Sequence, residues 1–451
     1  MTTAAMPRLD GELVADQAAL AAAADDFGHL VHRTPSFVLR PGSIEDVSRT
    51  IEWAQGRGFT VAARGQGHSV YGRSQASGGV VIDMTTRRTI GEVSDDRVAV
   101  DAGATWSDVV AATLPSGLTP PVLTDYLPLS VGGTLAVGGV GATTSRHGLQ
   151  TDNVLELDVV TGAGDVLTCS PNENAELFDS VRAGLGQAAV ITRATLRLMP
   201  APTQVRRYLL FYPDLAGMLH DERHLDEDGR FDAVQGAVLF TPQGVKFRLD
   251  AVAPVAPGCD ADDDTLLAGL ADIRSAAEVT TTPYLDYLNR LAALETALRG
   301  NGQWHHRHPW LTTFVGDSQV EDVVAHELRV LDPTELGPFG QVVVSAFRRD
   351  AVRTPLLQLP DDRRCYAFNF IRIPATDDPA IAARMVASNQ DIHDRTLAAG
   401  GTLYPVSAFS MTPEDWQQHF GPAWSQVQRA KGRFDPHHVL TPGYELFPRR
   451  S

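Results

Sequence analysis

The first part of the chain alternates short apolar runs with segments in which apolar residues recur at helical spacing. After Ser43, apolar positions recur at helical spacing as far as Ala54, which predicts a helix, and Ser43 with Asp46 forms a plausible capping box. Short apolar runs at 59–63 and 80–82 predict two strands that bracket a loop rich in glycine. The order helix, strand, loop and strand therefore describes one compact unit.

Farther along the sequence the pattern changes twice. A strand is predicted over 97–102 and an amphipathic helix over 106–114. After Pro202, apolar and polar residues alternate between 205 and 255, which predicts antiparallel strands. A further helix is predicted over 284–298. The change of pattern after Pro202 indicates a second domain.

Composition and charge narrow the classes of function. A length of 451 residues suggests two domains, and the 43% apolar and 21% charged residues are typical of a soluble globular protein. The net charge of −17 argues against nucleic acid or an anionic membrane as the main partner, so small molecules are the default ligands. The N-terminal segment lacks the basic start and continuous apolar core of a signal peptide, and no apolar run reaches membrane-spanning length. We expect a cytoplasmic protein.

The spacing of cysteines, aspartates and histidines disfavours disulfide and metal sites. The cysteines are odd in number and far apart: Cys169, Cys259 and Cys365. They indicate neither a disulfide framework nor a CxxC metal site. The aspartate run from Asp260 to Asp264 lacks the ligand order and glycine of an EF-hand and is interpreted as a solvated turn. Three histidines lie close together: His305, His306 and His308. Their spacing does not match a helical zinc site, and we expect no metal.

The glycine-rich loop is the stretch around which the protein is organised. Gly65, Gly67 and Gly72 leave its backbone unshielded, so that a diphosphate can approach the main-chain N–H groups. The lysine of a Walker motif is missing, and so is the GxGxxG that opens a helix in a Rossmann unit. The loop therefore indicates a different nucleotide fold. His68 within it is, from spacing alone, more commonly a turn residue than a functional one.

A second glycine-rich segment follows the proline pair at 120–121. Six glycines lie between 132 and 148, which indicates tight turns or close backbone approach. Such segments also serve as plain surface loops. The valines and leucine among these glycines, however, favour packing against a flat ligand over exposure to water.

Both segments resemble one known family. Gly65-Gln66-Gly67-His68-Ser69 followed by Gly78-Gly79-Val80-Val81-Ile82-Asp83-Met84 is similar to the flavin loop of the FAD-linked oxidases of the vanillyl-alcohol oxidase type, and most of all of the cytokinin dehydrogenases. The run Thr124-Asp125-Tyr126-Leu127, the run Val131-Gly132-Gly133-Thr134-Leu135, and the tail from Leu440 to Phe447 resemble the same family.

The resemblance implies an α+β fold. It consists of a two-subdomain PCMH-type FAD-binding domain and an inserted antiparallel-sheet substrate (cap) domain flanked by helices. The implied limits are 1–204 for the FAD-binding domain, 205–410 for the cap, and 411–451 for a C-terminal return to the FAD-binding domain.

FAD is the cofactor that the resemblance implies, held covalently through His68 at the 8α carbon of the flavin. The residues implied to bind it are Arg64, Gly65, Gln66, Gly67, His68, Ser69, Thr124, Asp125, Tyr126, Gly132, Gly133, Thr134, Gly138, Val140, Gly141, Val190, Ile191 and Tyr444. His308, Pro309 and Trp310 would wall the substrate cavity, although Trp310 could equally belong to the core.

Two acidic residues are candidates for catalysis. A hydride leaves carbon beside nitrogen or oxygen only when the heteroatom gives up or shares its proton, so a carboxylate must be in reach. Asp125 is our candidate, in an apolar run where burial would make it a stronger base. From sequence alone a turn or capping aspartate is the simpler interpretation. In the family, the matching aspartate accepts the proton of the substrate amine, and an acidic pair near the purine is matched here by Leu294-Glu295, which makes Glu295 the second candidate.

The implied reaction is oxidation of an N6-isoprenoid adenine to an imine, with FAD reduced. Water then splits the imine into adenine and an aldehyde. Two alternatives remain open, an FAD-dependent oxidase of an alcohol or amine in secondary metabolism and a non-catalytic flavin-bearing binding protein. The electron acceptor would be oxygen or a quinone.

Overall fold

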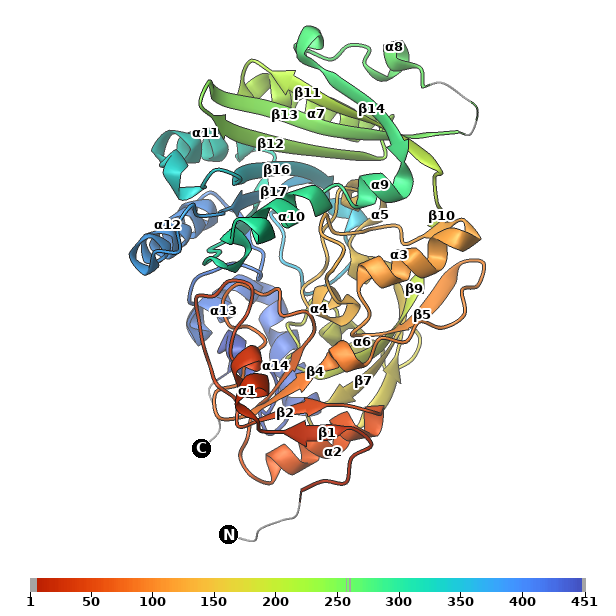
Figure 1. The fold of residues 1–451 in the computed structure, drawn as a ribbon, viewed down its shortest axis with the longest axis vertical. Coiled ribbons are helices and arrows are strands. Elements are labelled where there is room, and N and C mark those ends of the chain that lie inside the picture. Colours follow the sequence, from red (N-terminus) through yellow and green to blue (C-terminus); the bar gives the residue numbers. More distant parts are fainter. Residues whose placement is uncertain (1–5, 257, 259–260, 448–451) are drawn as a thin grey trace.

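The protein folds into two lobes that meet across helices and loops (Figure 1). The computed structural model describes residues 6–256, 258 and 261–447, so Cys259 and Asp260 lie outside the described residues. The lower lobe in this view carries the N-terminal segments and the last helices, and the upper lobe is built on one large sheet. Both ends of the protein lie at the lower lobe.

The N-terminal unit has the predicted order. Its mixed sheet has the strand order β1 (Glu12–Val14), β2 (Phe37–Arg40), β4 (Val80–Asp83), β3 (Val61–Arg64), in which β4 runs parallel to both of its neighbours. Helix α1 (Gln17–Ala23) precedes β2. The capping box of Ser43 and Asp46 is confirmed at the start of α2 (Ile44–Gln55). The parallel pairing of β3 and β4 makes the intervening glycine loop cross from one end of the sheet to the other.

A second, antiparallel sheet completes the core of the lower lobe. Its order is β5 (Arg97–Asp101), β9 (Ala189–Arg197), β7 (Val154–Thr161), β8 (Val166–Cys169). A two-stranded ribbon pairs β6 (Leu118–Thr119) with β10 (Met199–Pro200). The strand predicted over 97–102 and the helix predicted over 106–114 are confirmed by β5 and by α3 (Trp106–Thr113).

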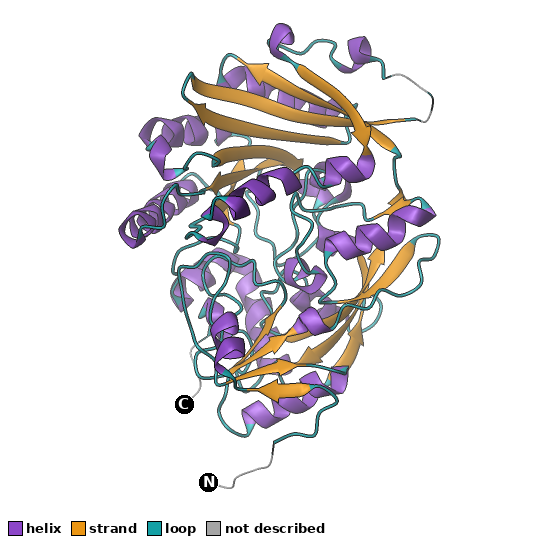
Figure 2. Cartoon of the chain, viewed as in Figure 1, coloured by secondary structure: helices purple, strands orange, loops and turns teal. Residues whose placement is uncertain are grey.

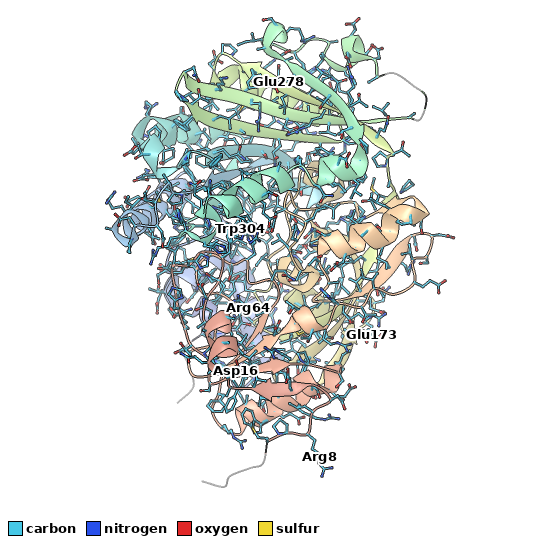
Figure 3. The ribbon with its side chains drawn as sticks, in the orientation of Figure 1. Arg8, Asp16, Arg64, Glu173, Glu278 and Trp304 are labelled. Atoms are coloured by element: carbon cyan, nitrogen blue, oxygen red, sulfur yellow. The ribbon has the colours of Figure 1, made fainter. Side chains whose placement is uncertain are left out.

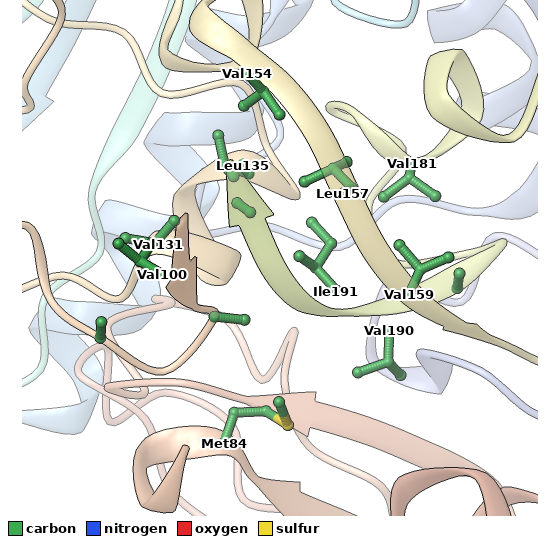
Figure 4. Close-up of a cluster of buried hydrophobic side chains, with 14 of the residues drawn as sticks. Met84, Val100, Val131, Leu135, Val154, Leu157, Val159, Val181, Val190 and Ile191 are labelled. Atoms are coloured by element: carbon green, nitrogen blue, oxygen red, sulfur yellow. The ribbon is translucent and has the colours of Figure 1, made fainter. Parts of the chain in front are cut away.

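Helices fill the space beside this sheet and bury its apolar face. They are α4 (Val131–Leu135) and α6 (Ala175–Val181), whereas α5 (Thr144–His147) contacts strand β16 (Gln341–Arg348) of the upper lobe. Figure 4 shows side chains from α4, β5, β7 and β9 meeting in one cluster, among them Leu135, Val100, Leu157 and Ile191. Burial of this cluster holds α4, and with it the second glycine-rich segment, against the sheet.

The upper lobe is an eight-stranded antiparallel sheet (Figure 2). Its order is β14 (Glu278–Pro283), β11 (Gln204–Tyr212), β13 (Gly244–Val255), β12 (Ala233–Thr241), β16 (Gln341–Arg348), β17 (Arg364–Ile371), β15 (Leu311–Gly316), β18 (Thr402–Leu403). The alternation between 205 and 255 is thereby confirmed as antiparallel strands. The limits of the domains themselves stay a prediction.

Helices cover the large sheet and return the backbone to the lower lobe. The helices packed on the sheet include α7 (Leu215–Asp228), α11 (Val320–Val330) and α12 (Pro379–Ala398), and α8 (Asp263–Leu266) lies beyond β13. The last helices are α13 (Pro413–Phe420) and α14 (Trp424–Phe434), and α14 contacts α6. Among the described residues, no helix has both the length and the apolar character needed to cross a bilayer.

The single helix predicted over 284–298 is wrong. The segment forms two helices, α9 (Tyr284–Leu288) and α10 (Ala292–Gly300). At the break the amide of Asn289 donates to the carbonyl of Leu285, and Arg290 turns inward to contact Asp125. The apolar spacing in the sequence continues across this break. The break lies where Arg290 contacts Asp125, a residue far away in sequence.

Candidate active site

A cavity of about 340 Å³ lies between the glycine loop, the sheets of the lower lobe and the large sheet. The end of β3 supplies Arg64, and the loop after it supplies the residues up to Ser74. Expected cofactor residues that line the cavity are Arg64, Gly65, Gln66, Gly67, His68, Ser69, Thr124, Gly132, Gly133, Thr134, Val140, Val190, Ile191 and Tyr444. The structure thus brings both glycine-rich segments to one space.

Several glycines of this cavity leave no room for a side chain. A Cβ atom added to Gly65 would lie 1.8 Å from the hydroxyl oxygen of Ser130, and one added to Gly132 would lie 2.8 Å from the Cβ atom of Ala102. Gly67 has a φ of +66°, which L-residues rarely adopt. Glycine at these positions therefore lets the backbone that lines the cavity pack closely against its neighbours.

Two arginines supply positive charge to the same wall. Arg64 donates to the carbonyl oxygen of Asp25 at 2.5 Å, and Arg73 donates to the carbonyl oxygen of Phe409 at 2.9 Å. The Nε atom of Arg73 is buried and has no hydrogen-bond partner among the described residues. An unpaired buried donor beside a cavity is expected to meet an acceptor of a ligand. The backbone and these cations fit a dinucleotide such as FAD.

His68 lies at the cavity with its imidazole stacked on Phe27. The two ring centroids are 4.0 Å apart and the planes differ by 18°. Burial lowers the pKa of His68 to about 4, so the imidazole is neutral at physiological pH. A neutral imidazole offers a free nitrogen lone pair, which a protonated one does not.

The loop that carries His68 is fixed by an aspartate that sequence reasoning missed. The carboxylate of Asp26 accepts hydrogen bonds from the hydroxyl of Ser69 at 2.8 Å and from the N–H of Gly72 at 2.6 Å. Burial raises the pKa of Asp26 to about 6. No local motif marks this residue, because its partners lie more than forty positions away in sequence.

A second, smaller cavity of about 110 Å³ adjoins the first. Both cavities are lined by Val140, Thr312 and Tyr404. The smaller one lies under β12, β15, β16 and β17, and its described lining includes Asp125 and Gly141. The amide oxygen of Asn369 and the hydroxyl of Ser345, which also line it, are buried without a hydrogen-bond partner among the described residues.

Asp125 is held by two side chains from the upper lobe. Arg290 donates to one carboxylate oxygen at 2.5 Å, and the amide nitrogen of Gln235 donates to the other at 2.8 Å. Our expectation of an apolar setting is therefore wrong. The neighbours in sequence are apolar, but β12 and the break between α9 and α10 bring a cation and an amide to the carboxylate. Two donors on different oxygens fix the orientation of the carboxylate.

Glu295 does not join Asp125. It pairs with Arg299 one turn along α10 at 2.8 Å, and it is absent from the described residues that line the two cavities. Its carboxylate instead approaches Tyr126, whose pKa is raised to about 12 by burial and by this charge. Helix α10 directs this carboxylate along the helix surface, and the catalytic role expected of Glu295 stays a prediction. Arg299 covers the ring of Trp304 at 4.4 Å.

The remaining expected residues lie at the border of the cavities. The ring of Tyr126 is 5.1 Å from that of His68. Gly138 has a φ of +121°, and an added Cβ atom would contact Leu149 and Tyr404. Trp310 lines the larger cavity, and Trp304 lies near the junction of the lobes, above Arg64 in the view of Figure 3.

Two of the three histidines at 305–308 direct ring nitrogens at backbone carbonyl oxygens. His306 Nδ1 lies 2.9 Å from the carbonyl oxygen of Pro374, and the two ring nitrogens of His308 lie 3.4 and 3.3 Å from the carbonyl oxygens of Arg372 and Trp304. Among the described residues, no group of three or more His, Cys, Asp and Glu side chains is arranged to hold a metal ion. In the aspartate run, Asp262 caps α8, and Asp263 pairs with Arg206 and so is more than a solvated turn residue.

Sequence reasoning also missed several lining residues that come from the C-terminal half of the protein. They are Thr312, Tyr404, Pro405, Val406 and Thr441 in the larger cavity, and Gln235, Ser345 and Asn369 in the smaller one. Four of them lie in strands, and the face that each presents depends on the register of the large sheet: Gln235, Thr312, Ser345 and Asn369. The others lie in loops, where no sequence periodicity marks them.

Comparison with known proteins agrees with this geometry. A family described as an FAD binding domain matches residues 35–170, and one described as "Cytokinin dehydrogenase 1, FAD and cytokinin binding" matches residues 255–447. Cytokinin dehydrogenase 9 of Oryza sativa subsp. japonica is 34% identical over 96% of this chain and 90% of its own length. Cytokinin dehydrogenase 4 of Arabidopsis thaliana is 33% identical over 96% and 92%. An uncharacterized oxidoreductase, ORF5 in the fasciation locus of Rhodococcoides fascians, is 40% identical over 96% and 98%.

Proposed function

Because the protein belongs to the cytokinin dehydrogenase family of FAD-dependent oxidoreductases, we propose that it oxidises the C–N bond that joins N6 to the isoprenoid group in N6-isoprenoid adenines. The imine product is hydrolysed by water to adenine and an aldehyde. FAD supplies the hydride-accepting ring when bound, and oxygen or a quinone is the terminal acceptor. The observation that carries this proposal is the carboxylate of Asp125 in a small cavity that adjoins the larger one.

Asp125 is the proton acceptor of the proposed reaction. Loss of hydride from the carbon next to N6 leaves positive charge on nitrogen unless the N–H proton is taken up, and a carboxylate in hydrogen-bond reach can take it. Arg290 holds one oxygen of the carboxylate, and Gln235 holds the other. These contacts support a base that is oriented before the substrate enters.

The walls of the smaller cavity suit a purine with an apolar substituent. Phe314, Phe347 and Val343 provide apolar surface for the isoprenoid group. The polar atoms of Ser345 and Asn369, which have no hydrogen-bond partner among the described residues, would meet ring nitrogens or N–H groups of the base. An alcohol or amine of similar size remains the second candidate, because the cavity's polar atoms do not by themselves require a purine.

His68 is the proposed point of covalent attachment of FAD. Its imidazole lines the larger cavity, and burial keeps it neutral, as nucleophilic attack by a ring nitrogen requires. Arg64, Arg73 and the glycine loop would hold the diphosphate. The expected cytoplasmic location of the enzyme is likewise proposed.

Anaerobic mixing of the flavin-loaded enzyme with isopentenyladenine tests the proposed substrate. We expect the visible flavin absorption to bleach rapidly, since the substrate delivers two electrons in one turnover. Bleaching by another amine or alcohol, without bleaching by isopentenyladenine, would support the second candidate and contradict the first.

A further inference from the structure

We propose that Phe27 is a positioning residue for the attachment of FAD: clamped between the imidazoles of His68 and His308, it fixes the ring plane of His68 toward the flavin. This inference rests on the proposed link through His68. It assigns a role to a phenylalanine that lies behind the cavity wall and is absent from the described residues that line the cavity.

Three rings form one continuous stack. Phe27 lies 4.0 Å from His68 with an interplanar angle of 18°, and 4.3 Å from His308 with an angle of 9°. Trp304 and Trp310 close the sides of the stack with their edges, at 5.0 and 5.1 Å from Phe27. Near-parallel contact on both faces of Phe27 restrains its rotation, and contact with Phe27 restrains His68 in turn.

The backbone around Phe27 fastens the stack to both lobes. The N–H of Phe27 donates to the carbonyl of Gly67 at 2.9 Å, and the N–H of His308 donates to the carbonyl of Gly28 at 3.0 Å. A Cβ atom on Gly28 would lie 2.1 Å from the carbonyl oxygen of Val70, so only glycine permits this approach. Phe27 and Gly28 therefore link the glycine loop to residues 304–310 of the upper lobe.

The stack meets two requirements of the attachment step. The imidazole must be uncharged, and Phe27 helps to exclude water from one of its faces, which disfavours protonation. The ring nitrogen must also point at the methyl carbon of the flavin, and small errors in such geometry are costly in rate. Phe27 contributes to both without contact with the reacting atoms.

The attachment is balanced as an oxidation. A C–N bond forms between the imidazole and the 8α carbon, while one C–H bond of the 8α methyl group and the imidazole N–H bond break. The two protons and two electrons released pass to dioxygen, which becomes hydrogen peroxide, and the flavin ends in its oxidised form. Nothing further is consumed.

The test measures link formation separately from FAD binding. Full-length protein produced without flavin is mixed with FAD in air, and samples are precipitated with acid over time to separate linked from dissociable flavin. Fluorescence of free FAD before precipitation measures total binding. The variants are Phe27→Leu, which removes the ring, Phe27→Tyr, which keeps it, and Phe37→Leu. Phe37 is the matched control because it is also half-buried but packs on Trp53 and Phe59 away from the cavity.

We expect Phe27→Leu to bind FAD but to form the link about tenfold to a hundredfold more slowly than the parent protein. Phe27→Tyr and Phe37→Leu should form it at the parental rate. Link formation by Phe27→Leu within about twofold of the parental rate would overturn the role of Phe27. If Phe27→Leu fails to bind FAD, His308→Leu takes its place, because it removes the outer ring of the stack. Slowing of link formation by about tenfold or more would then support the role of Phe27, and a rate within about twofold of the parental one would overturn it.

The two proposals fail differently. If the parent protein releases all its flavin on acid precipitation, the link through His68 is wrong, and the role of Phe27 is wrong with it. If the parent retains flavin and Phe27→Leu forms the link within about twofold of the parental rate, only the role of Phe27 is wrong.

Discussion

The substitution Asp125→Asn tests the proposed base with little change of shape. Asparagine can still accept the hydrogen bond of Arg290 through its amide oxygen, and Gln235 can turn its amide to meet the new NH₂ group. What is lost is the ability to accept a proton. Removal of a positioned general base costs about 10²–10⁴-fold in rate. Since each 1.36 kcal/mol is tenfold, the barrier to flavin reduction rises by about 2.7–5.4 kcal/mol.

The structure also bounds the cost in stability. Arg290 is 12% exposed and Asp125 is 36% exposed, so the pair is neither fully buried nor fully solvated. Replacing a charge-assisted hydrogen bond with a neutral one therefore costs about 1–2 kcal/mol, less than the loss of a partner in a fully buried pair. The variant should fold and bind FAD, and its defect should lie in chemistry.

The assay is the rate of flavin bleaching after rapid anaerobic mixing, measured over a range of isopentenyladenine concentrations. Asp263→Asn is the matched control, because Asp263 also pairs with an arginine, Arg206 at 2.8 Å, and is absent from the described lining of both cavities. The control should keep the parental rate. A limiting rate for Asp125→Asn within about tenfold of the parental value would refute the assignment of Asp125 as the base.

Three further substitutions test the glycine loop, the large sheet and the last helix. Gly65→Ala should abolish copurification of FAD, seen as loss of yellow colour, because its Cβ atom would collide with a hydroxyl oxygen at 1.8 Å, whereas Gly56→Ala, with no atom nearer than 3.8 Å, should remain yellow. Burial raises the pKa of Glu222 to about 8, so the folded protein holds a proton that the unfolded protein lacks between about pH 4.3 and 8, and stability falls as the pH rises through this window. The melting temperature of Glu222→Gln minus that of the parent should therefore increase as the pH is raised. A difference that does not change with pH would contradict this. Lys431→Met removes one partner of a buried ion pair with Asp435 (2.7 Å) and should lower the unfolding free energy by about 3–5 kcal/mol in urea, and a loss below about 1 kcal/mol would contradict the account.

Local signals in the sequence were sufficient to predict many of the helices and strands of the lower lobe. The helix after Ser43 could be predicted because its capping box and apolar spacing lie within a few residues of one another. The glycine loop could be recognised because only glycine tolerates such close backbone contact. The family matches confirm the α+β class, with an FAD-binding domain and a second domain typical of cytokinin dehydrogenases, and they support an enzyme rather than a binding protein.

Features that depend on the pairing of distant segments could not be predicted. The partners of Asp125 come from positions 110 and 165 residues away in sequence. The helical pattern over 284–298 carries no sign of the break at which Arg290 turns inward. Glu295 was placed by its sequence position alone, which fixes its place along α10 but not the direction of its carboxylate.

Product analysis after a single anaerobic turnover decides whether the enzyme oxidises an N6-isoprenoid adenine. Flavin-loaded enzyme is mixed with excess isopentenyladenine without an electron acceptor, and adenine and the aldehyde are quantified by chromatography. We expect one equivalent of each per flavin reduced. Full recovery of unreacted isopentenyladenine, from enzyme whose flavin is reduced by another amine or alcohol, would contradict it.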